Sequence, residues 1–269
     1  MFTRIEPIIW FFDAEWIPNP AAGSMLYDLP DSLSEKEIFD EMWKAGGATP
    51  EKPMPYLKTV LCRVVSIAAV IRKNENGGVA LSLRSRPKNP DDALECEEKA
   101  VLQAFFDGVE KHDPQLVGFN SRDSDLKILT QRALAHGIQA PKFFQRPDRP
   151  WDERNIDLME HLSGRTQAKP SLHELATMTG IPGKIDADGE HIAALWLEGK
   201  LEKIVAYNEC DALTTYLLWL RSVFVSGRIS AEAYRAEEDL LRALLESEIQ
   251  REGKSHLEKY LQKWEALQS

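Results

Sequence analysis

The sequence predicts an α/β fold in which helices cover a sheet, and three observations support this prediction. Five apolar residues, rich in Ile and aromatic side chains, stand together at 8–12 and predict a strand buried on both faces. Two apolar runs, 60–72 and 79–83, are joined by a Gly-rich turn and predict a hairpin. Apolar residues at helical spacing follow, in a helix predicted to start at Asp91 or Asp92. Strands and helices therefore alternate, as in proteins whose helices pack on a sheet.

The remaining segments continue this order. Further strands are predicted at 115–119 and 155–159, the second of them at an edge of the sheet. Helices are predicted over five more ranges, which are 120–137, 171–180, 192–197, 201–225 and 230–264. The first of these starts within 120–125, and the last is one helix or a pair. The chain therefore ends in a helical region.

Residues 17–58 interrupt the order with a segment rich in Pro and Gly. Within it, Ser34 and Glu37 have the spacing of a capping box, which predicts a short helix over 34–44. The segment has too few apolar residues to bury a core of its own, so we interpret it as an inserted flap. We therefore expect one domain over 1–228, containing the insertion 17–58, and a helical C-terminal extension over 229–269 packed on or near it.

The composition is that of an ordinary soluble globular protein, with 43% hydrophobic and 28% charged residues among 269. Its apolar runs are far shorter than the roughly 20 residues that span a bilayer, so no membrane segment is expected. The three cysteines are widely spaced, which argues against a disulfide framework or a zinc site and fits a cytoplasmic location. The net charge of −10 argues against a broad basic surface for nucleic acid. It argues less against an enzyme that holds a chain end at metal-bound acids.

Two acids, Asp13 and Glu15, end the first predicted strand. They stand at i and i+2, so on an extended backbone their side chains project from the same face. Two such carboxylates without a basic neighbour repel each other unless a cation lies between them. The pair is either a strand that runs out into a solvated acidic turn or half of a divalent-metal site, and further ligands decide between the two.

Three more acids occur at the ends of predicted strands or within a helix. Asp125 follows a strand at the start of a helix, Asp157 ends the edge strand, and Asp211 lies in the middle of the helix 201–225. A carboxylate among apolar helix residues is costly unless it is paired, so Asp211 is either in a salt bridge with Lys203 or a distant Arg, or a metal ligand. Tyr207 stands four residues before it, so the two side chains share one helix face.

These residues resemble the motifs of the DEDD superfamily of 3′-to-5′ exonucleases (DnaQ-like) in its tyrosine-containing DEDDy form. The three motifs are 12–15, 118–120 with Asp125 behind it, and Tyr207 to Asp211. More narrowly, the chain resembles the predicted exonucleases related to the proofreading domain of family B DNA polymerases. That narrower resemblance adds three blocks, which are 156–159, 171–176 and 180–184. Together the motifs span roughly residues 8–225 in the expected order.

The resemblance implies a ribonuclease H-like fold, a mixed five-stranded sheet flanked by helices. It implies metal-dependent hydrolysis of phosphodiester bonds from the 3′ end of single-stranded DNA, which releases nucleoside 5′-monophosphates. Two divalent cations, Mg²⁺ or Mn²⁺, would act as cofactors, held by Asp13, Glu15, Asp125 and Asp211, while Tyr207 orients the attacking water. An exonuclease of the same fold that trims RNA 3′ ends and a non-catalytic nucleic-acid-binding module are the alternatives. The oligomeric state is left open.

The resemblance also implies that Ala14, Trp16 and Asn120 bind the substrate. Trp16 replaces a small Thr of many relatives, and either stacks on a base or fills the core. Asn120 either contacts the terminal nucleotide or caps the helix that follows. Ser124 and Lys127 differ from the Phe and Pro of close relatives and change the wall of the substrate cleft.

Polar residues outside these motifs carry weaker expectations. Asp157 is expected to have a structural hydrogen-bonding role rather than a ligand role. The two densest groups of basic residues are either phosphate contacts or ordinary surface charge. These groups are Arg84, Arg86 and Lys88, followed by Lys142, Arg146, Arg149 and Arg154.

Overall fold

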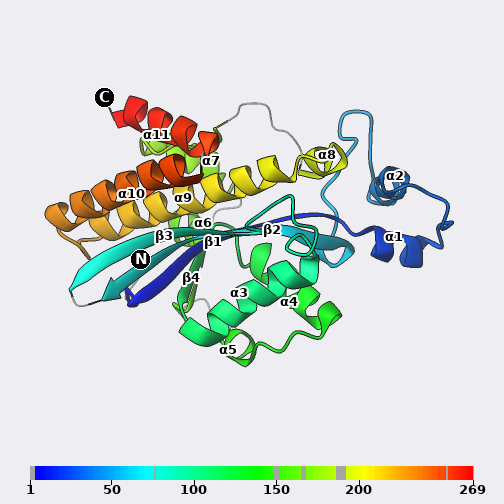
Figure 1. The fold of residues 1–269 in the computed structure, drawn as a ribbon, viewed down its shortest axis with the longest axis horizontal. Helices are drawn as coiled ribbons and strands as arrows, with labels where there is room; N and C mark the ends of the chain where they lie inside the picture. Colours follow the sequence, from blue (N-terminus) through cyan, green and yellow to red (C-terminus); the bar gives the residue numbers. More distant parts are fainter. Residues whose placement is uncertain are drawn as a thin grey trace.

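The computed structural model describes residues 4–75, 77–147, 152–164, 168–185, 192–252 and 254–268. Its centre is a five-stranded sheet with the strand order β3-β2-β1-β4-β5 (Figure 1). The strands are β1 (Ile8–Pro18), β2 (Cys62–Glu75), β3 (Gly78–Arg86), β4 (Gln115–Gly118) and β5 (Asn155–Asp157). β1, β2 and β3 pair antiparallel, whereas β4 and β5 run parallel to β1. This mixed sheet confirms the predicted ribonuclease H-like fold class, with β5 at the edge as expected.

Helices cover both faces of the sheet. One face carries α3 (Glu98–His112), α4 (Asp125–His136) and α5 (Pro141–Phe144). The other carries α9 (Leu201–Val225), α10 (Ala231–Glu252) and α11 (Ser255–Gln268), as Figure 1 shows. The shorter helices are α6 (Leu158–Ser163), α7 (Leu172–Met178), α8 (Ile192–Leu197) and the 3₁₀ turn η1 (Thr59–Leu61). Among the described residues, no helix combines the length and apolar character needed to cross a membrane.

The alternation of side chains along β1 divides the core into two halves. Trp10 and Phe12 belong to the core beneath α3 and α4, whereas Ile9 and Phe11 pack against α9 and the C-terminal helices. Successive strand residues point to opposite faces, so both faces must be apolar in a strand covered on both sides. The uninterrupted apolar run of the sequence is the consequence.

Most helix bounds agree with the sequence prediction, but the start of α3 does not. The predicted start at Asp91 or Asp92 is wrong, because α3 begins at Glu98. The Asp92 carboxylate accepts the N–H of Leu94 at 2.9 Å, and the Asp92 carbonyl accepts the N–H of Cys96. Asp92 therefore closes a separate turn before the helix, because aspartate side chains compete well for nearby backbone donors.

The inserted segment forms two helices, α1 (Pro20–Tyr27) and α2 (Glu35–Ala45), at one end of the molecule (Figure 1). α2 carries the predicted capping box between Ser34 and Glu37, whereas α1 was not predicted. Phe39 and Met42 of α2 are fully buried and belong to the same apolar cluster as Trp10 and Phe12. The insertion therefore shares the core of the sheet and has no separate core.

The C-terminal helices pack on the same face of the sheet as α9. Tyr260 and Trp264 of α11 are fully buried there. The Arg72 guanidinium of β2 donates two hydrogen bonds to the Glu237 carboxylate of α10, at 2.6 and 2.8 Å, inside this interface. Apolar packing and a buried ion pair thus hold α10 and α11 against the sheet.

Candidate active site

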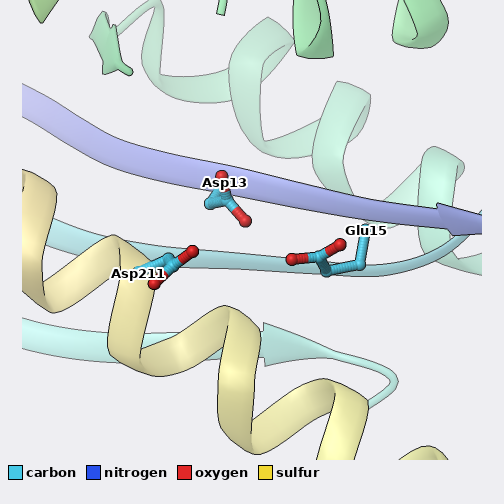
Figure 2. Close-up of side chains that lie close together, drawn as sticks. All are labelled: Asp13, Glu15 and Asp211. Carbon is cyan, nitrogen blue, oxygen red and sulfur yellow. The ribbon is translucent and has the colours of Figure 1, made fainter. Parts of the chain in front are cut away.

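The strand period of β1 places its two acids opposite α9. The ring of Phe11 lies 5.0 Å from that of Tyr216 and 4.9 Å from that of Trp219. Two residues along a strand cover about 6.8 Å, which corresponds to four or five residues of a helix at about 1.5 Å each. Asp13 therefore lies opposite the turn of α9 that contains Asp211 (Figure 2).

Three carboxylates converge at this point. One carboxylate oxygen from each of Asp13, Glu15 and Asp211 lies within 4.8 Å of those of the other two, and the three side chains are half-buried. Figure 2 shows Asp13 and Glu15 reaching from β1 toward Asp211 on α9. The structure thus brings together three of the four acids that the sequence predicted as metal ligands.

The electrostatics of this cluster are unfavourable without a cation. Burial and the charges of the neighbouring acids raise the pKa of Asp13 and of Glu15 well above the usual range. Burial likewise raises the pKa of Asp211 to about 7. The positive charge of Lys184 acts in the opposite direction on Glu15 and Asp211. Among the described residues Asp211 forms no ion pair, so the predicted salt-bridge alternative is wrong.

Asn208 holds Asp13 in place. Its amide Nδ2 donates to Asp13 Oδ2 at 2.6 Å, and its Oδ1 accepts the Ser66 hydroxyl of β2 at 2.9 Å. Asn208 is fully buried, so both ends of its amide are used inside the protein. The sequence analysis missed this residue, although its position three residues before Asp211 places it on the same helix face.

Tyr207 lies on that face as predicted, and its hydroxyl is hydrogen-bonded to Asp211. Burial and the charges of Asp211, Glu15 and Asp13 raise the pKa of Tyr207 well above its usual value. The phenol therefore remains protonated at neutral pH and can act as a hydrogen-bond donor, but not as a base.

Asp125 lies in the same cleft but has two protein partners. Its Oδ1 accepts the N–H of Ala14 at 2.9 Å, and its Oδ2 accepts the Ser124 hydroxyl at 2.7 Å. β4 pairs with β1 only as far as Phe11, so the Asp125 side chain takes the place of a strand partner for Ala14. Burial raises the pKa of Asp125 to about 6. Its role as a metal ligand stays a prediction.

Asp157 has the expected structural role. It accepts the backbone N–H groups of Asn120 at 2.9 Å and Arg122 at 3.0 Å, and so shapes the loop that leads to Asp125. Asn120 has a left-handed φ of 58°, which Asn tolerates better than most residues. It does not cap α4, whose N-cap position is Ser124. The substrate contact of Asn120 stays a prediction.

The acids line a cleft of about 1450 Å³. The predicted residues Ala14, Trp16, Asp125 and Tyr207 also line it, and Phe119 and Ser124 line it in place of Asn120, which is not among its described wall residues. The Ala14 side chain points into the core and is buried, and Trp16 packs partly against that core. Trp16 thus lies both in the core and in the cleft wall.

One of the two basic groups lies at the cleft. Arg84, Arg86 and Lys88, at the end of β3, line it together with Lys184. The second group does not line it among the described residues. Arg146 of this group is buried away from the cleft and bonds to Asp113 and to backbone carbonyls, while Arg149 lies outside the described residues. The first group therefore gives a predominantly acidic protein a local supply of positive charge beside its acids.

Comparison with known families places the chain in one of them. Residues 54–264 match a family described as predicted 3′-5′ exonuclease related to the exonuclease domain of PolB, which is well over half of the chain. The chain belongs to this family. The description of the family points to 3′–5′ exonuclease activity, a hydrolysis of nucleic acid. Asp125, Tyr207 and Asp211 lie inside the matched range, whereas Asp13 and Glu15 precede it.

Two known proteins similar to this chain are DNA polymerases. It is 26% identical over 184 residues to a DNA polymerase of Archaeoglobus fulgidus, covering 63% of this chain and 23% of the polymerase. The family B DNA polymerase of the archaeon Pyrobaculum calidifontis has a TM-score of 0.46 and 17% identity, over 83% of this chain and 26% of that one. The chain thus spans about a quarter of the length of each polymerase.

Proposed function

We propose that this exonuclease hydrolyses phosphodiester bonds from the 3′ end of single-stranded DNA and releases nucleoside 5′-monophosphates. Two divalent cations, Mg²⁺ or Mn²⁺, would be its cofactors, as in the DEDDy type. The observation that carries the proposal is the convergence of Asp13, Glu15 and Asp211 in a cleft that also presents cationic side chains. Similarity to a DNA polymerase of Archaeoglobus fulgidus favours DNA over RNA.

The donor set suits a hard divalent cation. All three converging ligands are carboxylate oxygens, which Mg²⁺ and Mn²⁺ prefer over softer metals. The raised pKa values of these acids show that the site favours added positive charge, supplied either by protons or by a metal ion. Asp13, Glu15 and Asp211 would hold one ion, and Asp13 with Asp125 the second.

Bound ions of this kind supply an activated water and stabilise charge on the attacking and leaving oxygens of the phosphodiester. The protein's own part is to orient the reactants. Tyr207, fixed by donating its hydroxyl proton to Asp211, would accept a hydrogen bond from the water on its oxygen and so orient it. Asn208 prevents Asp13 from rotating away. Arg84, Arg86, Lys88 and Lys184 are placed to contact phosphates of the bound strand.

The test is degradation of a 5′-labelled single-stranded DNA, and of the RNA of the same sequence, with Mn²⁺. The wild type is compared with Asp211→Asn, which keeps the shape of the side chain but loses its charge. We expect a ladder that shortens from the 3′ end, faster on DNA, and a rate more than about 100-fold lower in the variant.

Asp107→Asn is the matched control, because Asp107 is an exposed acid on α3, outside the cleft. It should degrade DNA at the wild-type rate. Faster degradation of RNA would make RNA, not DNA, the proposed substrate. Equal rates for wild type and Asp211→Asn would refute the metal site. Binding of DNA by folded, metal-loaded protein without any ladder would support the non-catalytic alternative.

A further inference from the structure

Tyr56 is an exposed aromatic residue inside the cleft. It belongs to the inserted segment 17–58, and 69% of its surface is accessible to solvent. Its hydroxyl has no hydrogen bond to another described residue, in contrast to that of Tyr207. Exposed aromatic rings are the usual platforms for bases in single-strand binding sites. The ring of Tyr56 is exposed in the wall of the cleft, where a bound strand can reach it.

The backbone around Tyr56 is held firmly. Its neighbours Pro55 and Leu57 are both buried. Leu57 packs over the end of α2 so closely that a Cβ on Gly46 would lie 2.6 Å from its Cδ2. Between these two buried residues, the side chain of Tyr56 faces outward. A ring presented in this way loses little conformational freedom when it binds a partner.

Tyr56 lies in the same cleft as the acids and next to Trp16. Both aromatic residues line this cleft together with Asp13, Glu15 and Asp125. Its ring lies 6.2 Å from that of Trp16, nearly perpendicular to it at 88°. Trp16 follows Glu15 directly at an irregularity of the β1–β2 pairing, where Val65 is the extra residue. Two aromatic rings from separate segments thus meet beside the carboxylates.

We propose that Tyr56, supported edge-on by Trp16, stacks on the base of the 3′-terminal nucleotide and positions its phosphodiester over Asp13, Glu15 and Asp211. This inference rests on the proposed exonuclease function and gives the insertion a role in it. Stacking needs an exposed base face, so the terminal nucleotide has to be unpaired. The geometry therefore predicts a preference for single-stranded ends and indifference to which base is present.

The test compares two 5′-labelled DNA strands that differ only at the 3′ end, one with a normal nucleotide and one with an abasic sugar. On the normal end, Tyr56→Ala should raise KM about tenfold, the loss expected for one stacked base. On the abasic end, wild type and Tyr56→Ala should have the same KM. Tyr56→Phe, which keeps the ring, should behave as wild type on both strands.

Leu26→Ala is the matched control, because Leu26 is exposed on α1 of the same insertion but does not line the cleft. Its KM should not change on either strand. An unchanged KM of Tyr56→Ala on the normal end would overturn the inference. An equal loss on both ends would also overturn it, since the side chain would then act on something other than the base.

A binding measurement keeps this inference separate from the proposed function. With Ca²⁺ in place of Mg²⁺, the fluorescence of a 3′-terminal 2-aminopurine should be quenched on binding to wild type but not to Tyr56→Ala. Quenching by a protein that cuts neither DNA nor RNA would support the stacking site and refute the exonuclease function. Binding without quenching by wild type would overturn the stacking site even if the exonuclease is active.

Discussion

Two acids, the buried Glu209 and the half-buried Asp211, stand two residues apart on α9 and have opposite surroundings. Glu209 accepts hydrogen bonds from the Ser85 hydroxyl at 2.7 Å, from Lys254 Nζ at 2.9 Å, and pairs with His256 Nε2 at 2.7 Å. These partners lower its pKa despite its burial. Asp211 faces other carboxylates, and its pKa is raised to about 7. The deeper burial of Glu209 therefore does not make it the acid with the raised pKa.

The difference distinguishes an acid held by the fold from one that we propose as a metal ligand. Glu209 joins Ser85 of β3, Lys254 and His256 of α11 to α9, so its charge is neutralised by the fold itself. Among the described residues Asp211 has no ion-pair partner, although the charge of Lys184 acts to lower its pKa. Perturbed, poorly neutralised acids in a cleft are typical of functional sites. The comparison predicts opposite effects when each charge is removed.

The largest effect is expected at Glu209. Glu209→Gln replaces a buried carboxylate that bonds to Ser85, Lys254 and His256, while Lys254 keeps Glu248 at 3.4 Å, so the free energy of unfolding should fall by about 2–3 kcal/mol. Urea unfolding measures this value. Glu246→Gln, at an exposed site on α10, should change it by less than about 0.5 kcal/mol. A Glu209→Gln protein as stable as wild type would mean that the charge of Glu209 does not stabilise the fold.

A smaller effect of opposite sign is expected at Asp211. A carboxyl whose pKa is raised in the folded state binds its proton more tightly there than in the unfolded chain. Its contribution to stability is therefore greatest at low pH and is lost as the pH rises from about 4 to about 7. Metal-free wild type should lose about 1–2 kcal/mol across this window, and Asp211→Asn should lose less.

Thermal unfolding at pH 5 and pH 8, with and without Mg²⁺, measures this dependence. At pH 8 without metal, Asp211→Asn should melt above wild type, because the variant relieves repulsion among the acids. Added Mg²⁺ should raise the melting temperature of wild type but not of the variant. A variant that melts below wild type at pH 8 would mean that Asp211 is neutralised within the fold.

The sequence predicted the acid cluster because its spacings are periodic. The i, i+2 spacing of Asp13 and Glu15 and the i, i+4 spacing of Tyr207 and Asp211 determine a shared face once the strand and the helix are assigned. The role of Asp125 toward Ala14 was not predictable in this way. It depends on β4 ending before it reaches Ala14, which is a property of the sheet and not of local spacing.

Tyr56 and Asn208 were missed for related reasons. Tyr56 lies in an insertion without periodic apolar spacing, so nothing in the sequence indicates which side chain enters the cleft. Asn208 lies on the predicted face, but an Asn on a helix has many possible partners, and the choice of Asp13 follows from the packing of α9 on β1. The contact with Ser66 follows from the same packing.

The smallest effect concerns Asn208, the neutral residue that bonds to Asp13 and Ser66. Asn208→Ala removes the donor to Asp13 Oδ2 without changing the charge of the cluster. Affinity for Mn²⁺ should fall about tenfold, the usual cost of losing a residue that orients a metal ligand. Ser66→Ala should have a weaker effect in the same direction, because Ser66 acts only through Asn208. Titration calorimetry with Mn²⁺ measures both affinities. If Ser66→Ala reduced affinity more than Asn208→Ala, Asp13 would have to be held by another contact. The proposed series of hydrogen bonds from Ser66 through Asn208 to Asp13 would then be wrong.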